Sequence, residues 1–429
     1  MFGIAALLAG CKTEEEVKES AQSFNYVVDH FADVEIMRYQ VDNWDSLSLN
    51  QKKLVYYLSE AALCGRDIIF DQNCAYNILI KNALEAIVDT YSGDKSTQDW
   101  EKFMEYVKRF WFSNGIHHHY SYAKFYPEIS KEYFLSLMNG SDKNKIFAGD
   151  QLQQKIVMDL IANVIFDTTK VSLKVSQDPN ADLVQSSAVN FYRNVTQQEV
   201  EEYYEYYRTS LGKAYDPEKP ISLGLNSQLV KDLEINKIYE RVYCTEGLYA
   251  QPLQKVVFWL QKAAEVAEND AQKEHITTLI DYYKTGDLFT WDRYNVQWVE
   301  DTQSFVDYVN GFIEVYNDPM GRKATWEAVV DYKDLKNSRR TEIISQNAQW
   351  FENNSPIADK FKKENVKGVT AKVITVAHLG GDCFPATPIG INLPNANWIR
   401  KEHGSKSELF LPLFSVAYPV ENSLLYLMV

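Results

Sequence analysis

The first part of the chain has a helical pattern of hydrophobic positions. Between Glu14 and Lys170, apolar residues recur at intervals of three and four, as in the segment Asp99–Phe110. That spacing places apolar side chains on one face of a helix, which a soluble helix buries against its neighbours. The pattern therefore predicts a bundle of helices over this part of the chain.

Between residues 171 and 230 the hydrophobic period shortens, and short strands are predicted. Apolar and polar residues alternate over Val171–Val175, and Ile221–Leu223 lies between turn residues. One helix is well marked inside this region, because Thr196 and Glu199 have the spacing of a capping box. This region is therefore expected to mix strands with at least that helix.

Helical periodicity returns in the second half of the chain. We expect helices over Pro252–Gly286, another helix after Asp301, and a polar helical stretch over Trp326–Lys363. The segment Lys372–Ala377 is the strongest strand in the sequence, because it is rich in β-branched residues.

Composition and charge narrow the class of protein. The chain has 429 residues, of which 45% are hydrophobic and 24% charged, which is typical of soluble globular proteins and excludes collagen-like, coiled-coil and disordered chains. Acidic residues number 59 against 44 basic ones, and no cluster of Lys or Arg stands out. A nucleic-acid backbone would be repelled, so we expect no nucleic-acid partner.

The N-terminus has the composition of a processing signal. An uncharged apolar run closes on Leu8-Ala9-Gly10-Cys11, which resembles the lipobox of bacterial lipoproteins. The resemblance implies that Cys11 is lipidated and that the protein is a periplasmic or cell-envelope lipoprotein with a lipid anchor. A buried first turn of helix in a cytoplasmic protein is the alternative.

The C-terminal residues 408–429 are apolar but follow neither a helical nor a strand period. Two prolines and the pair Glu421-Asn422 interrupt them, whereas a membrane span needs about 20 apolar residues. We expect a tail that forms neither a membrane helix nor a packing face.

The histidines do not form a recognisable metal motif. A zinc hydrolase motif needs two His residues one helical turn apart with an adjacent Glu, and none of the seven His residues has that context. His117, His118 and His119 are consecutive, so their side chains point in different directions. A hydrogen-bonded or surface loop is favoured there over a metal site. Cys383 lies beside Asp382 but has no evident base, so a buried thiol is favoured over a nucleophile.

Two segments have the composition of a ligand site. Gly390–Asn395 places two amide side chains across a proline, beside extended backbone with which a peptide could pair as an added strand. Glu314 and Tyr316 fall on one side of an extended chain, where the carboxylate could bind an ammonium and the phenol could donate to an oxyanion. The alternatives are a loop in which each Asn satisfies a turn, and an exposed Glu with a packed Tyr.

These segments resemble the two substrate-cleft signatures of dipeptidyl peptidase III, a zinc exopeptidase family that removes dipeptides from the N-termini of short peptides. The matching stretches are Val309–Pro319 and Pro388–Asn395 with Trp398–Arg400. The likeness is closest to Bacteroidetes-type members and runs from about residue 20 to Ser407. Weaker similarity lies at Trp111–Tyr120 and Gly224–Ser227.

The resemblance implies a role for each matching residue. Glu314 would hold the free ammonium of the peptide together with Asn392 and Asn395. Tyr316 would be the catalytic residue that stabilises the tetrahedral transition state. The other implied substrate-binding residues are an edge strand that includes Pro388, Ile389 and Gly390, and a supporting Arg400.

The resemblance also implies a fold that is mainly α with a small β-core (α+β). It would be the lower lobe of a two-lobed protein whose upper lobe carries zinc. The implied divisions are a lipoprotein-like signal over residues 1–11, the lower lobe over 12–331, a helical excursion of the upper lobe over 332–368, a return to the β-core over 369–407, and the apolar tail over 408–429.

The zinc motif of the family, His-Glu-x-x-Gly-His, does not occur in this sequence. We therefore expect a chain truncated before that motif, which binds no zinc and is inactive alone, with short peptides that have a free N-terminus as its partners. Two other interpretations stay open. One is a non-catalytic periplasmic oligopeptide-binding lipoprotein, and the other is an unstable gene fragment.

Overall fold

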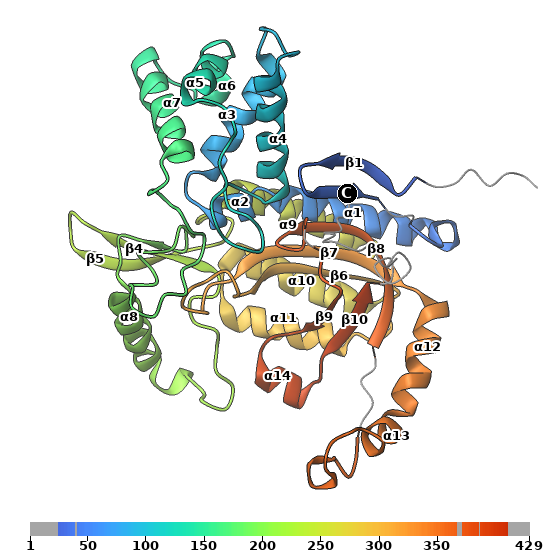
Figure 1. The fold of residues 1–429 in the computed structure, drawn as a ribbon. Coiled ribbons are helices and arrows are strands. Elements are labelled where there is room, and N and C mark those ends of the chain that lie inside the picture. The colour runs from blue at the N-terminus through green and yellow to red at the C-terminus, as the bar shows by residue number, and fades with distance from the viewer. Residues whose placement is uncertain (1–24, 39–40, 367–370, 386, 411–429) are drawn as a thin grey trace, which may run out of the picture.

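The structure is a computed structural model that describes residues 25–38, 41–366, 371–385 and 387–410. Figure 1 shows a central sheet with helices packed against it, a bundle of helices at the top of the view, and a smaller sheet at the left. Cys11 and residues 411–429 lie outside the described residues, so the predictions for them stay predictions. In the described ranges, no helix is both long and apolar enough to cross a membrane.

A β-hairpin precedes the helical bundle. The expectation of helix from Glu14 is wrong at the hairpin, because the short run of β-branched and aromatic residues around Val27 favours a strand. The helical prediction is confirmed from Leu49 to Phe166. The elements are β1 (Val27–Phe31), β2 (Val34–Met37), α1 (Leu49–Gly65), α2 (Ile68–Asn73), α3 (Asn77–Thr90), α4 (Gln98–Phe112), α5 (Lys131–Asn139), α6 (Lys143–Ile146) and α7 (Gln151–Phe166), with a 3-10 turn at Trp44–Ser46.

A small sheet with the strand order β3-β4-β5 follows the bundle. The capping box at Thr196 and Glu199 is confirmed, since each side chain bonds to the backbone of the other residue. Of the two predicted strands, Val171–Val175 makes one isolated bridge at Leu173 and Ile221–Leu223 is not a strand. Both strand predictions are therefore wrong. An alternation of apolar and polar residues over so few positions does not produce a strand where the chain forms turns. The elements are β3 (Tyr192–Arg193), α8 (Gln197–Ser210), the 3-10 turn Gly212–Ala214, β4 (Ser227–Asp232) and β5 (Lys237–Val242).

Three long helices and a five-stranded sheet form the centre of the molecule. The predicted end of a helix at Gly286 is confirmed, since this glycine has φ +71°, a conformation that glycine adopts readily. The sheet order is β6-β7-β8-β10-β9, with antiparallel pairs except for the parallel pair β8–β10. The elements are α9 (Ala250–Glu265), α10 (Asp270–Thr285), α11 (Leu288–Glu300), β6 (Val306–Glu314), β7 (Thr325–Lys333), β8 (Ala371–Gly381), β9 (Gly390–Leu393) and β10 (Lys406–Phe410).

Two of these strands correct the helical predictions. The segment after Asp301 forms β6 instead of a helix. The predicted helical stretch Trp326–Lys363 begins as β7, but its later part is confirmed by the helices Leu335–Gln346 and Ala348–Asn353. Both strands are buried on both faces over nearly their whole length. Because both faces are buried, neither strand strictly alternates apolar with polar residues, and periodicity alone does not separate such a strand from a buried helix. The strand predicted at Lys372–Ala377 is confirmed as part of β8.

The main hydrophobic core joins the sheet to α1, α9, α10 and α11. Trp326 on β7 is fully buried in it. A Cβ at Gly65, at the end of α1, would lie 2.2 Å from the indole of Trp326, so the helix approaches the sheet closely only because this residue is glycine. The structure is thus mainly helical around a small β-core, as predicted.

Three further helices lie near the C-terminal end of the described chain. Figure 1 shows α12 and α13 extending away from the sheet, and neither helix has a buried residue. The predicted tail begins too early, because Glu408 to Phe410 belong to β10 and Phe410 is fully buried. The helices are α12 (Leu335–Gln346), α13 (Ala348–Asn353) and α14 (Asn397–Glu402), with a 3-10 turn at Asp359–Phe361.

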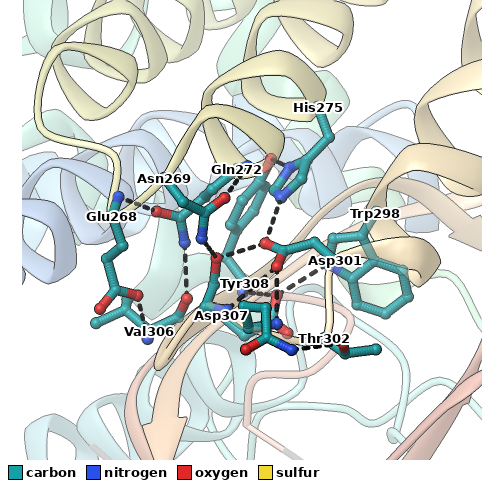
Figure 2. Close-up of polar contacts among 12 residues, drawn as sticks. Glu268, Asn269, Gln272, His275, Trp298, Asp301, Thr302, Val306, Asp307 and Tyr308 are labelled. Carbon is teal, nitrogen blue, oxygen red and sulfur yellow. Dashed lines mark hydrogen bonds and ion pairs between the residues drawn. The ribbon is translucent and has the colours of Figure 1, made fainter.

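A polar network, exposed at Glu268 and buried at His275 and Asp301, anchors the start of β6 (Figure 2). Glu268 accepts hydrogen bonds from two consecutive backbone amides, the second that of Val306, each at 2.8 Å. His275 on α10 lies between two partners, with Nε2 3.3 Å from the Asp301 carboxyl and Nδ1 3.0 Å from the Tyr308 hydroxyl. These bonds join α10, the α11–β6 connection and β6. They therefore hold in place the strand that ends at Glu314.

Candidate functional site

The site begins where β6 ends. A register shift between Phe312 and Glu314 interrupts the pairing of β6 with β7, and such bulges redirect the side chains that follow. Glu314 is half-buried and lines a pocket of about 460 Å³ together with Tyr316, Arg322 and Asn395. The carboxyl group is thus held at the wall of an open pocket.

Asn395 also lines this pocket, although it follows β9, which lies at the opposite end of the strand order from β6. Its side-chain Nδ2 donates to the carbonyl of Ile313 on β6 at 3.4 Å. Leu393 and Pro394 line a second, smaller cavity together with Val309 and Ile313. The sheet is therefore curved enough that the segment after β9 meets β6, although the two strands lie at opposite ends of the strand order.

The electrostatics of Glu314 suit a site that binds a cation. Burial raises the pKa of its carboxyl, hydrogen bonds from Asn395 and Tyr316 oppose that rise, and the nearby charge of Asp382 adds to it. The negative charge of Glu314 is in turn the main reason why the pKa of the Tyr316 phenol is raised. Tyr316 is 72% exposed, so its bond to Glu314 can exchange for a bond to a ligand.

Arg322 is a cation in the pocket lining, but it is engaged elsewhere. Its guanidinium donates to the carbonyl of Leu223 at 3.3 Å and lies 4.4 Å from the ring centroid of Tyr204. Among the described residues, Glu314 forms no ion pair. A ligand ammonium would therefore be the first cation to meet this carboxyl group directly.

The strand β9 supplies an edge beside the site. It pairs on one side with β10 and is the last strand in the order, so its other edge has no partner strand among the described residues. A Cβ at Gly390 would lie 2.6 Å from the carbonyl of Glu408, so the close pairing with β10 requires glycine. Ile389 is 62% exposed and Pro388 is half-buried at the start of this edge. An unpaired edge of this kind can accept an extended peptide.

The structure gathers some of the predicted site residues and not others. Glu314, Tyr316 and Asn395 lie together at one pocket. Asn392 on β9 and Arg400 on α14 are exposed, and neither belongs to the described residues that line this pocket. The roles that the resemblance implies for all of these residues stay predictions.

Five residues next to the pocket were not predicted as site residues. Asp382 accepts hydrogen bonds from Asn317 and Thr325, and Cys383 donates its thiol hydrogen to Glu327 at 3.3 Å. Burial raises the pKa of Glu327 well above its ordinary value and so disfavours its charged form. Burial also raises the pKa of the Cys383 thiol, as a buried thiol predicts. A signal for Asp382 was present in the two glycines before it, which indicate a tight turn.

The three consecutive histidines do not converge on a metal ion. Nε2 of His117 is 2.7 Å from the carbonyl of Val171, and Nδ1 of His118 accepts hydrogen bonds from two backbone amides. The ring of His119 stacks on His118 and lies tilted against Tyr120. In the part of the chain that the structure describes, no group of three or more His, Cys, Asp or Glu residues could hold a metal ion.

Comparison with known proteins gives a consistent family relationship. The model of peptidase family M49 matches residues 162–423, so the likeness continues past Ser407, where the sequence analysis ended it. Dipeptidyl peptidase 3 of Homo sapiens is 23% identical over 88% of this chain and 54% of its own length. The Rattus norvegicus protein is 28% identical over 52% of this chain and 29% of its own length. The chain thus spans about half of the human relative and less of the rat one.

Solved structures show the same fold. The structure of DPP III from Caldithrix abyssi superimposes with a TM-score of 0.62 at 18% identity, covering 90% of this chain and 58% of that one. Dipeptidyl-peptidase III from Corallococcus sp. strain EGB gives a TM-score of 0.56 at 18% identity, covering 91% and 58%. The predicted fold class, mainly α with a small β-core, is confirmed by this likeness.

Proposed function

The chain belongs to peptidase family M49, and on that premise we propose that its β-core binds short peptides by their free amino terminus. The peptide ammonium donates to the Glu314 carboxylate and displaces the exposed Tyr316 phenol from it. Asn395 offers its side-chain oxygen to the same ammonium. The peptide backbone then lies along the free edge of β9 as an added strand.

One observation carries this proposal. Glu314 is a half-buried carboxyl without a resident cation among the described residues, and its hydrogen-bond partners are neutral side chains at the wall of an open pocket. Burial raises the pKa of this group, whereas a bound ammonium favours its charged form. Ligand binding and ionisation of Glu314 therefore reinforce each other.

Cleavage is a separate question from binding. M49 peptidases are zinc-dependent, and the zinc supplies an activated water that attacks the peptide bond. The described residues do not gather a zinc ligand set, so no step of this proposal runs through the metal. We propose that the 429-residue chain by itself binds peptides and does not release dipeptides from them.

The test compares tetra-alanine with its N-acetylated form by titration calorimetry on purified, dialysed protein. We expect binding of the free peptide and at least tenfold weaker binding of the acetylated one, since acetylation removes the charge that Glu314 binds. Release of a chromogenic dipeptide is measured in parallel, with and without added zinc. Equal affinity for the two peptides would contradict the binding proposal, and turnover with one bound zinc per chain would contradict the absence of cleavage.

The lipidation of Cys11 is proposed on its sequence context alone. If Leu8–Cys11 acts as a lipobox, the peptide-binding core is carried on the cell envelope, as in an oligopeptide-binding lipoprotein. Incorporation of labelled palmitate in a bacterial host tests this. Label in the wild-type chain and none in Cys11→Ser is expected, and absence of label from both would favour the cytoplasmic alternative.

A further inference from the structure

Asp382 lies at the turn after β8 and joins two segments that flank the pocket. Its carboxyl oxygens accept hydrogen bonds from Nδ2 of Asn317 at 3.1 and 3.3 Å, and from Oγ1 of Thr325 at 2.9 Å. Asn317 directly follows Tyr316, and Thr325 is the first residue of β7. The side chain of Asp382 therefore holds both ends of the loop between β6 and β7.

Thr325 extends this connection to Glu314 itself. Its single hydroxyl hydrogen is shared between two acceptors, the Asp382 carboxyl at 2.9 Å and the backbone carbonyl of Glu314 at 3.1 Å. Thr325 is fully buried, so water does not compete for these contacts. Asp382 is thus linked through a single side chain to the backbone of the residue that we place at the ammonium.

The middle of the same loop is fixed from another direction. The carboxyl of Asp318 accepts hydrogen bonds from the backbone amides of Met320, Arg322 and Lys323 and from the Tyr192 hydroxyl. The loop is rigid in its middle for that reason. Asp382 holds the same loop near its two ends, through Asn317 and Thr325.

The charge of Asp382 also reaches the pocket. It contributes to the raised pKa values of Glu314 and Glu327, and it opposes the fall in the pKa of Lys174, which burial lowers to about 8. Tyr122 and Cys383 are the other titratable groups influenced by it. Burial raises the pKa of Glu327 well above its ordinary value and so disfavours a negative charge there.

We propose that Asp382 is a positioning residue of this pocket, which fixes the turn that bears Glu314 and Tyr316 and adds a second negative charge that favours an ammonium ligand. The inference rests on the proposed function, because Asp382 supports the same pocket in which Glu314 is proposed to bind the ammonium. Asp382 itself does not contact the peptide. It acts through its hydrogen bonds to Asn317 and Thr325 and through the electrostatic effect of its negative charge on the pocket.

Two variants separate the two effects of Asp382. Asp382→Asn keeps the shape and an acceptor oxygen but removes the charge. Thr325→Val keeps the charge but removes the hydroxyl that connects it to Glu314. The matched control is Asp71→Asn, because Asp71 is also half-buried and accepts bonds from a hydroxyl and an amide, those of Tyr249 and Asn190, away from the pocket.

The readouts are the affinity for tetra-alanine and the titration midpoint of the Glu314 carboxyl, followed by carbon-13 NMR and assigned with Glu314→Gln. Asp382→Asn is expected to lower the Glu314 midpoint and to weaken binding about fivefold, the size expected for one charge removed near an ammonium in partly solvated surroundings. Thr325→Val should weaken binding with little change in the midpoint. Asp71→Asn should change neither.

The outcomes distinguish this inference from the proposed function. An unchanged Glu314 midpoint in Asp382→Asn, in a protein with the wild-type circular dichroism spectrum, would overturn the role of Asp382. The midpoint is measured without peptide, so it remains informative if the wild-type chain binds no tetra-alanine. If the wild-type chain binds no tetra-alanine and Asp382→Asn still lowers the Glu314 midpoint, the proposed function is overturned and the electrostatic coupling is supported.

Discussion

Two groups of carboxyl side chains lie on the same five-stranded sheet and differ in what surrounds them. The enclosed group consists of Asp307, Asp331 and Glu408, each at most 4% exposed. The open group consists of Glu314 and Asp382, which are half-buried at the end of the sheet. Burial opposes ionisation of Glu314 as well as of the enclosed group, but Glu314 lines a pocket that a ligand can enter.

The enclosed group already contains its cation. Nζ of Lys406 lies 2.6 Å from the Asp307 carboxyl and 4.3 Å from the ring centroid of Trp298, and both residues of the pair are buried. Asp331 and Glu408 have no hydrogen-bond partner on either oxygen, and their pKa values are raised, mainly by burial. At Glu314 the corresponding cation is missing. The comparison suggests that a binding carboxyl is recognised by the lack of a resident cation more than by the size of its pKa shift.

The largest expected effect tests the enclosed pair. Lys406→Met leaves the Asp307 carboxyl buried without its cation, so we expect a loss of about 3–5 kcal/mol in the free energy of unfolding. Urea denaturation measures it, and Lys401→Met, at an exposed position on α14, is the control that should change little. A loss of less than about 1 kcal/mol would show that Lys406 is not needed to compensate the buried charge of Asp307.

The next effect concerns pH. Burial, with the charge of Asp307, raises the pKa of Glu408 from 4.5 to about 7 in the folded chain, so the folded state binds this proton more tightly than the unfolded state. The resulting stability is fully present below pH 4.5 and is lost as the pH rises towards 7. The charged groups that influence Glu408 are Asp307, Asp331, Lys333, Lys372 and Lys406.

Glu408→Gln stays neutral at every pH, so it should remove this part of the pH dependence. The unfolding free energy of the variant minus that of wild type should therefore increase by up to about 3 kcal/mol when the pH is raised from about 5 to about 8. Urea denaturation at both pH values tests it. Glu246→Gln, at an exposed turn, should leave the pH dependence as it is. The same dependence in Glu408→Gln as in wild type would contradict the assignment.

The smallest effect sharpens the description of the open group. Asn395→Ala removes a side chain that hydrogen-bonds Glu314, so peptide binding should weaken by about 1 kcal/mol. Asn392→Ala is the matched variant, because the family resemblance gives both residues the same role while the structure places only Asn395 at the pocket. Calorimetry with tetra-alanine compares them. An equal loss in both variants would favour the resemblance over the observed placement.

The helical parts of the fold were predictable because their signals are local. The capping box at Thr196 and the glycine at the end of α10 each act within a few residues. The strands β6 and β7 were not, since burial on both faces removes the alternation that identifies a strand. The hydrophobic pattern therefore predicted the helical bundle well but did not predict β6 and β7, two strands of the sheet that carries the site.

The site shows the same division. Glu314 and Tyr316 are close in sequence, so their proximity could be expected if the segment is extended. Whether Asn392 or Asn395 reaches them depends on the curvature of the sheet, which no local pattern encodes. The contact between Asp382 and Thr325 joins residues 57 positions apart and exists because β7 pairs with the end of β8. Long-range pairing of this kind lies beyond a reading of local spacing.

The central claim is that Glu314 recognises the charged amino terminus of a peptide. The most direct test measures four dissociation constants by calorimetry, for wild type and Glu314→Gln with tetra-alanine and N-acetyl-tetra-alanine. We expect Glu314→Gln to lose at least about 1.5 kcal/mol of binding free energy with the free peptide and almost none with the acetylated one. An equal effect of the substitution on both peptides, or none on either, would contradict the account.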